Sequence, residues 1–67
     1  MKIPIKSEYI TLGNFLKITD FINSGGQAKI AVKELHILVN GEVENRRGRK
    51  LYKNDKIEIE MKKFEVI

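Results

Sequence analysis

The amino-acid sequence predicts an α+β domain in which two short helices, in a helix-turn-helix-like arrangement, pack against a small, mostly antiparallel sheet. Apolar residues in the first half of the chain recur at the spacing of amphipathic helices, whereas those in the second half alternate with charged residues as in half-buried strands. An Asn-Gly dipeptide between apolar residues also marks a β-hairpin. The 67 residues contain no repeat, linker or low-complexity segment, so we expect a single domain over residues 1–67.

The first predicted elements are an edge strand and a helix. Residues 1–7 alternate isoleucines with lysines, and Pro4 restricts such a strand to the edge of a sheet. Residues 11–22 predict a helix with Thr11 as its N-cap. The positions with helical spacing are Leu12, Phe15, Leu16 and Thr19. Gly13 weakens this helix by up to about 1 kcal/mol relative to alanine, so we expect the helix to depend on tertiary packing.

A second helix is predicted over residues 23–36. Ser24 and Gln27 have the spacing of a capping box, in which each side chain bonds to the backbone N–H of the other residue. The buried face of this helix is expected to contain Ala28, Ala31, Val32 and Leu35. One flank of that face is expected to carry Lys29, Lys33 and His36.

The second half of the chain predicts strands joined by tight turns. Asn40-Gly41 is the dipeptide best suited to a type I′ turn, in which both central residues have positive φ. Asn54-Asp55 predicts a further turn, since asparagine tolerates positive φ better than most residues. The strand that follows is expected to bury Ile57, Ile59 and Met61. Phe64 and Val66 are expected to extend the sheet.

Composition argues against several classes of protein. With no cysteine, the chain has neither a disulfide nor a thiolate nucleophile. The single histidine, His36, has no second histidine or suitably spaced acids beside it, so we expect no metal site and no cofactor. No nucleophile has an adjacent general base, which argues against an enzyme. No apolar run approaches the ~20 residues of a membrane-spanning helix, and the start lacks a secretory signal. We therefore expect a cytoplasmic protein without a membrane partner. We also expect it to be a monomer.

The most distinctive segment is the basic loop, residues 45–53, which carries five cations and no acid. These cations are Arg46, Arg47, Arg49, Lys50 and Lys53. Like charges repel, and folding alone gives no reason to gather them, so we expect the loop to bind an anion. Arginines favour phosphate because each guanidinium can hold it through two parallel hydrogen bonds. Gly48 is expected to bend the loop so that neighbouring side chains converge on one anion.

The overall charge agrees with an anionic partner but does not identify it. The chain carries 13 Lys+Arg against 9 Asp+Glu, a net charge of +4, and its pI is near 9.5. Charge alone leaves RNA, DNA, an acidic protein and an anionic lipid as candidates. A solvated loop without any partner is an equal alternative on this ground.

The order of the fragments resembles a known family. The fragments LGNFLK, NSGGQAK, HILVNGEV, the basic loop and LYKNDKIEI together are similar to the S-four (S4) domain, named after ribosomal small-subunit protein four. The resemblance covers a core of about residues 10–60 and is greatest to the stand-alone bacterial YaaA-like proteins. It implies a non-catalytic RNA-binding module that docks on structured RNA, with rRNA in ribosome assembly or on ribosomal particles as the expected partner.

The resemblance also implies site residues. The polar turn of the family falls on Ser24, its QA(R/K) step falls on residues 27–29, and its basic loop falls on residues 46–50. Tyr52 lies beside the loop, where its ring could stack on a base or its hydroxyl could meet a phosphate. The predicted RNA-binding set is Ser24, Gln27, Lys29, Lys33, Arg46, Arg47, Arg49, Lys50, Tyr52 and Lys53. The aromatic residues expected in the core instead are Phe15, Phe21 and Phe64.

Three positions depart from the family pattern. Residues 11–13 replace an Arg-Leu-Asp start of the first helix, so an RNA contact by that arginine is missing here. Leu35 stands where a glycine usually ends the second helix, and Asn54 stands where a glycine usually precedes the last strands. The asparagine is a mild change because it also tolerates positive φ.

Two alternatives remain open. The backbone amides at residues 24–26 either form a phosphate site or belong to an ordinary capped helix start. The protein is alternatively a small adaptor whose basic loop meets an acidic partner protein, with Ile30 as an exposed apolar contact. The RNA hypothesis predicts that alanine at Arg46, Arg47 and Arg49 abolishes RNA binding and leaves the fold intact.

Overall fold

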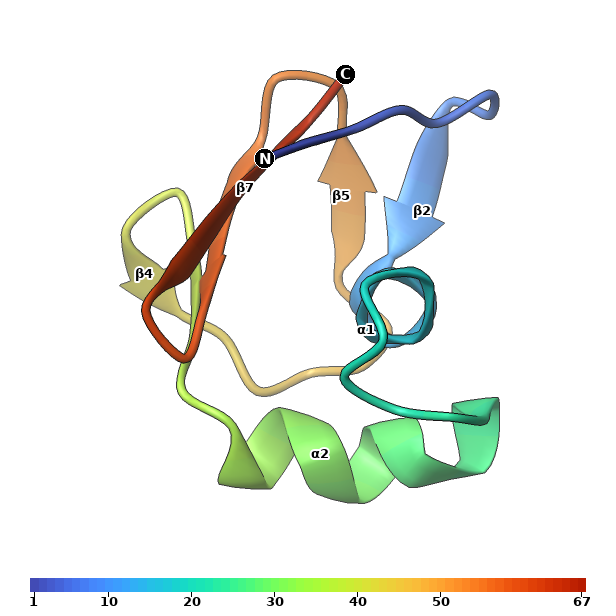
Figure 1. Ribbon diagram of the computed structural model, residues 1–67, viewed down its shortest axis with the longest axis vertical. Helices are drawn as coiled ribbons and strands as arrows, with labels where there is room; N and C mark the ends of the chain where they lie inside the picture. The colour runs from blue at the N-terminus through green and yellow to red at the C-terminus, as the bar shows by residue number, and fades with distance from the viewer.

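The computed structural model describes residues 1–67 and contains two helices packed on mostly antiparallel strands. Its elements, in chain order, are β1 (Lys2–Ile3), β2 (Tyr9–Thr11), α1 (Leu12–Ile18), a 3₁₀ turn η1 (Gly25–Gln27), α2 (Ala28–Glu34), β3 (Ile37–Val39), β4 (Glu42–Val43), β5 (Lys50–Tyr52), β6 (Lys56–Ile59) and β7 (Lys62–Val66). In Figure 1, α2 lies at the end of the molecule opposite the two chain termini. No helix is long and apolar enough to cross a membrane.

The strands divide between two sheets. Five strands form one sheet in the order β1-β7-β6-β3-β4, whose strand pairs are antiparallel except for the parallel pair β1 and β7. The strand that contains Pro4 in the prediction is therefore an edge strand, as expected, although it is shorter than predicted. The other two strands, β2 and β5, form a separate antiparallel ribbon beside α1 (Figure 1). Residues 44–49, which include the first part of the basic loop, produce this division because they carry the chain away from β4 before β5 begins.

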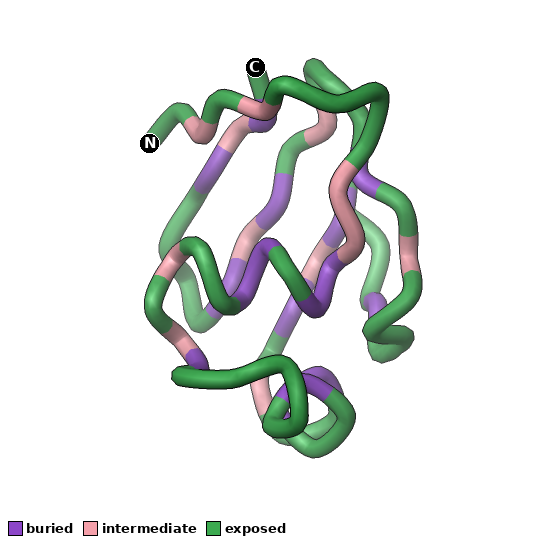
Figure 2. Tube along the Cα trace, turned by 90° about the vertical axis from the view of Figure 1, so that its right-hand side faces the viewer, coloured by how far each residue is buried: buried purple, intermediate pink, exposed green.

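The core lies between the helices and the inner faces of the strands. Figure 2 shows buried residues alternating with intermediate or exposed ones along the strands, as the sequence pattern predicts. Phe15 and Phe64 meet edge to face, with ring centroids 5.6 Å apart, and Phe21 contacts Phe64 in the same way at 6.1 Å. Aromatic pairs of this geometry stabilise a core beyond the area they bury. The prediction that the phenylalanines belong to the core is confirmed for Phe15 and Phe64, whereas Phe21 is partly buried and packs against the core.

The first helix is shorter than predicted. Thr11 is its N-cap and accepts a hydrogen bond from the backbone N–H of Asn14 at 3.3 Å, as expected. The helix ends at Ile18, four residues early, because Thr19 hydroxyl donates to the Phe15 carbonyl at 2.7 Å and Asp20 adopts a φ of 66°. A left-handed residue reverses the chain and stops the helical hydrogen bonds.

The start of the second helix corrects the predicted capping box. Gly25–Gln27 wind as a 3₁₀ turn, so α2 begins only at Ala28. Ser24 makes no side-chain cap, and Gln27 Oε1 accepts from the backbone N–H of Asn23 at 2.6 Å instead of from Ser24. The tighter turn changes the register between the two side chains, so the reciprocal pair of bonds does not form.

The hairpin turns agree with the sequence in two places and correct it in a third. Asn40 and Gly41 have φ of 52° and 87°, and Asn54 has φ of 80°, so both predicted turns are confirmed. The prediction that Met61 faces inward is wrong, since its side chain is 84% exposed. Glu60 and Met61, with φ of 49° and 70°, form the turn between β6 and β7. Glu60 is held there because its carboxylate accepts the backbone N–H of His36 at 2.6 Å.

Met61→Gly is expected to raise the melting temperature. A left-handed backbone costs a non-glycine residue about 1–2 kcal/mol, and the exposed Met61 side chain has little packing to lose. Part of the gain is offset by the greater freedom of glycine in the unfolded chain, so a rise of a few degrees, about 2–6 °C, is expected by thermal unfolding. Gly41→Ala is the matched control at a φ of 87° and should lower the melting temperature. An unchanged or lowered value for Met61→Gly would contradict the strain.

Candidate nucleic-acid interface

The basic loop is fixed on the start of the first helix. It runs from β4 past α2 to α1 before it enters β5 (Figure 1). The backbone N–H of Leu12 donates to the Arg49 carbonyl at 2.8 Å, and that of Gly13 donates to the Arg47 carbonyl at 2.9 Å. The first N–H groups of a helix have no partner within the helix. Here two of them hold the loop, so the backbone of the loop is ordered before any ligand binds.

Gly13 allows three segments to meet at this point. A Cβ atom built on Gly13 would lie 3.2 Å from the Ala28 Cβ and 3.4 Å from the Arg47 carbonyl oxygen. The distance to the Ala28 Cβ is tighter than ordinary van der Waals contact, and that to the Arg47 oxygen is at its lower limit. The sequence pattern registers Gly13 only as a weak helix residue. In the structure its missing side chain lets α1, the start of α2 and the basic loop pack together.

Glu44 is the anion that gathers part of the cation cluster. Its side chain is only 6% exposed, and its carboxylate lies 2.9 Å from Arg46 Nε and 2.7 Å from Arg49 Nη1. Arg46 also donates through Nη2 at 3.2 Å and through its backbone N–H at 3.1 Å. The expectation that folding gives no reason to gather these cations is therefore wrong for two of them. Gly48 does not have the positive φ at which a bend of the loop would require glycine. The anion on which Arg46 and Arg49 converge is Glu44.

The hydrogen bonds of this cluster keep Glu44 ionised although it is buried. Hydrogen bonds from the Arg46 side chain, together with those from Arg49, lower the pKa of the Glu44 carboxyl from 4.5 to about 2. Burial acts in the opposite direction and is overcome. The same contact raises the pKa of the Arg46 guanidinium. A buried carboxylate that loses its partners is costly, so both arginines stabilise the fold, whatever else they bind.

The remaining loop cations are free of acidic partners. Arg47, Lys50 and Lys53 are exposed, and none of them forms an ion pair. Arg47 lines a shallow hollow that the loop shares with the two helix starts, and the hollow is lined by Thr11, Gly13, Asn14, Gly25, Ala28, Arg47 and Gly48. The structure thus brings the basic loop and the start of the second helix together. Arg47 and Gly25 both line the hollow.

The other predicted residues of the second helix lie outside this hollow. Lys29 and Lys33 are exposed on α2 but do not line it. Ser24 is exposed with a hydroxyl that caps no helix, whereas the Gln27 side chain is occupied by the Asn23 N–H. These four residues therefore do not line the hollow to which Arg47 contributes.

Sequence reasoning missed Tyr9. In the ribbon of β2 and β5, Tyr9 is paired with Tyr52, and their ring centroids are 6.0 Å apart. Both rings are exposed, and Lys50 Nζ lies 4.9 Å from the centroid of the Tyr9 ring. The sequence signal that could have found it is the alternation of polar or aromatic residues with an apolar one in both strands. Tyr9 and Thr11 flank Ile10 in β2, and Lys50 and Tyr52 flank Leu51 in β5.

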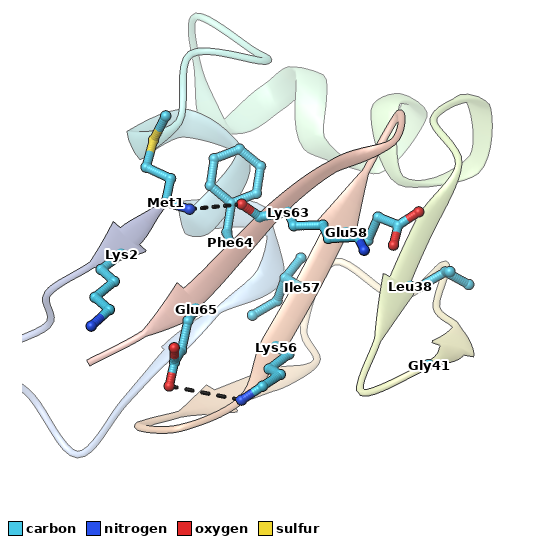
Figure 3. Close-up of a pocket in the computed structure, with 10 residues that line it drawn as sticks. All are labelled: Met1, Lys2, Leu38, Gly41, Lys56, Ile57, Glu58, Lys63, Phe64 and Glu65. Carbon is cyan, nitrogen blue, oxygen red and sulfur yellow. Dashed lines mark hydrogen bonds and ion pairs between the residues drawn. The ribbon is translucent and has the colours of Figure 1, made fainter.

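A hollow on the outer face of the five-stranded sheet contains none of the predicted RNA-binding residues. Figure 3 shows its lining, which includes Lys2, Lys56 and Lys63 together with Glu58 and Glu65. Lysines and glutamates alternate across the paired strands. Two of the three lysines are therefore offset by glutamates, and this face carries little net charge. No group of three or more potential metal ligands is present in the structure.

Comparisons with known proteins agree with the resemblance seen in the sequence. The sequence model of a protein family described as "S4 domain" matches residues 3–67. The chain is also 59% identical, over 58 residues, to the "Probable ribosome maturation protein RlbA" of Bacillus subtilis (strain 168). That alignment covers 87% of this chain and 82% of the relative.

The Glu44 cluster predicts a specific loss of stability in acid. Because the pKa of the Glu44 carboxyl falls from 4.5 to about 2 on folding, its contribution is complete above pH 4.5 and is lost as the pH falls to about 2. Glu44→Gln lacks this contribution at every pH and should unfold at a lower temperature at neutral pH. The difference between the two proteins should shrink toward pH 2 in thermal unfolding followed by circular dichroism. A difference that stays constant down to that pH would contradict the ion cluster.

Proposed function

The chain belongs to the S4 domain family, and from that premise we propose that it is a non-catalytic module that binds structured RNA through the basic loop and the start of α2. The name of the Bacillus relative, a probable ribosome maturation protein, supports the proposal that the bound RNA is rRNA during ribosome maturation. Binding depends on phosphate neutralisation, and the protein recognises the shape of folded RNA more than its base sequence.

One observation carries the proposal. The basic loop presents three exposed cations without acidic partners on a backbone that is already fixed by Glu44 and by the first amides of α1. A loop that is ordered before binding loses less conformational freedom when RNA docks. Arg47 is central because it forms no ion pair and lines the hollow between the two helix starts. Lys50 at the start of β5 and Lys53 directly after it extend the positive surface.

The arginines that hold Glu44 have a second role in this proposal. One carboxylate faces two guanidinium groups, so the cluster keeps a net positive charge. Arg46 is 70% exposed and presents its outer edge to solvent, where it can meet a phosphate. Arg49 is only 33% exposed and acts mainly by positioning the loop. Replacing all three arginines would therefore confuse loss of binding with loss of structure.

The adaptor alternative has weaker support. Ile30 is exposed at 61%, as that alternative requires. A single apolar side chain on α2 does not form the contiguous patch that a protein partner needs. The unpaired cations of the basic loop are better suited to bind the phosphates of a nucleic acid than to contact an apolar protein surface. Partner capture that persists after nuclease treatment would favour the adaptor.

The triple variant with Arg47→Ala, Lys50→Ala and Lys53→Ala tests the proposal. It should bind rRNA fragments at least about tenfold more weakly because it loses phosphate contacts. The dependence of its affinity on salt should also be shallower, since each phosphate contact contributes about 0.7–0.9 to the slope of log affinity against log salt. Its melting temperature should stay close to that of the parent, since none of the three side chains holds Glu44. The measurement is a salt titration of binding by fluorescence anisotropy, with circular dichroism as the folding check.

The outer sheet face provides a control with the same change of charge. Lys2→Ala, Lys56→Ala and Lys63→Ala remove three cations from the hollow of Figure 3. This variant should keep both the affinity and the salt slope of the parent. If the two triple variants lose affinity equally, binding follows net charge alone and the proposed surface is wrong.

A further inference from the structure

We propose that Tyr9, Tyr52 and Lys50 form a base-stacking site, the tyrosine platform, which accepts one unpaired base of the bound RNA. This inference rests on the proposed function, because it names the part of the RNA that the protein would contact beyond its phosphates. It adds to the interface a residue, Tyr9, that the sequence pattern did not indicate. It also gives the Tyr52 ring a role distinct from that of the cations in the basic loop.

The geometry of the β2–β5 ribbon places the three side chains on one open face. Tyr9 pairs with Tyr52 and Thr11 pairs with Lys50, while the intervening Leu51 is fully buried on the other face. The Tyr9 and Tyr52 rings are 38% and 44% exposed and tilted by 51°. Each ring limits the movement of the other, so the platform is partly ordered before a base arrives. A cross-strand pair also stabilises the ribbon, which is compatible with this role.

Lys50 gives the platform a cation of its own. Its Nζ lies 4.9 Å from the Tyr9 ring centroid, whereas no cation lies over the Tyr52 ring. The Tyr52 ring therefore offers the stacking surface, and Lys50 is placed beside it for the phosphate of the same nucleotide. Aromatic rings next to a lysine match the two parts of a nucleotide, its base and its charge.

The platform is continuous with the Arg47 site. A second hollow beside Tyr9 is lined by Ser7, Tyr9, Ile10, Thr11, Asn14, Lys17 and Ile18. Thr11 and Asn14 also line the hollow that contains Arg47. One surface therefore leads from Arg47 along the start of α1 to Tyr9. A strand whose phosphates contact the basic loop would bring a neighbouring base to the platform, provided that the base is not paired.

The test compares two RNA hairpins that differ only at one bulged position. One carries an unpaired adenosine and the other an abasic residue at the same place, so their phosphates are identical. The parent protein should bind the adenosine bulge about tenfold more tightly, which is within the range found for stacking of one base. Tyr52→Val keeps a strand-forming residue but removes the ring, and it should bind both hairpins with equal affinity. Tyr52→Phe should retain the preference because the ring, not the hydroxyl, makes the contact.

Tyrosine fluorescence provides a readout that needs no variant. The chain contains two tyrosines and no tryptophan, so its intrinsic emission reports on the platform alone. The adenosine bulge should quench this emission, and the abasic hairpin should not. If the parent binds both hairpins equally and neither quenches, the platform is wrong while the proposed function stands. If the parent binds neither hairpin at low salt, the proposed function itself fails. If Tyr52→Val does not fold, the preference and the quenching of the parent decide.

Discussion

The buried carboxylate of Glu44, held between Arg46 and Arg49, is the interaction on which the functional surface depends. The segment between β4 and β5 contains no regular element that could fix it. Glu44 supplies that order by accepting four hydrogen bonds from residues two and five positions further along the chain. Without it the arginines would repel one another, and the loop would keep only its backbone hydrogen bonds to the start of α1. The negative charge of Glu44 thus orders a loop that presents positive charge to solvent.

The first helix receives this loop and transmits its position to the rest of the fold. Two of its terminal amides bind loop carbonyls, and Gly13 leaves the space in which the loop and α2 approach. Since the loop leads directly into β5, the same contacts set the register of β5 with β2. The cations and the tyrosines therefore share one support. Structure and recognition are coupled here through backbone hydrogen bonds, and the exposed side chains can vary without disturbing them.

The fold class was predictable from the sequence because it depends on local patterns. The Asn40-Gly41 turn, the apolar face of α2 and the alternation in β6 each follow from a few neighbouring residues. Met61 was misplaced because alternation does not show where a strand ends, and nothing in its chemistry marks a left-handed turn. The capping box failed because Gly25 and Gly26 permit a 3₁₀ turn as readily as a helical one.

The candidate site was only partly predictable. Charge counting found the basic loop but could not distinguish cations that pair internally from those that remain free. Glu44 lies in the chain next to the exposed strand β4 and shows no apolar pattern that would mark it as buried. Tyr9 was missed since its partner Tyr52 is distant in sequence, and only the pairing of β2 with β5 brings them together. Pair contacts across the chain are what composition and periodicity cannot supply.

The parallel pairing of the first and last strands has a mechanical consequence. The backbone N–H of Glu65 donates to the Met1 carbonyl at 2.8 Å, that of Ile67 to the Ile3 carbonyl at 2.9 Å, and that of Ile5 to the Ile67 carbonyl at 3.0 Å. A force that pulls the two termini apart would slide β1 along β7 and load these bonds together instead of opening them one at a time. The domain should resist such a pull better than its small core suggests. It should unfold more easily when the force acts between the N-terminus and the β6–β7 turn, which lie at the same end of the β1–β7 pair.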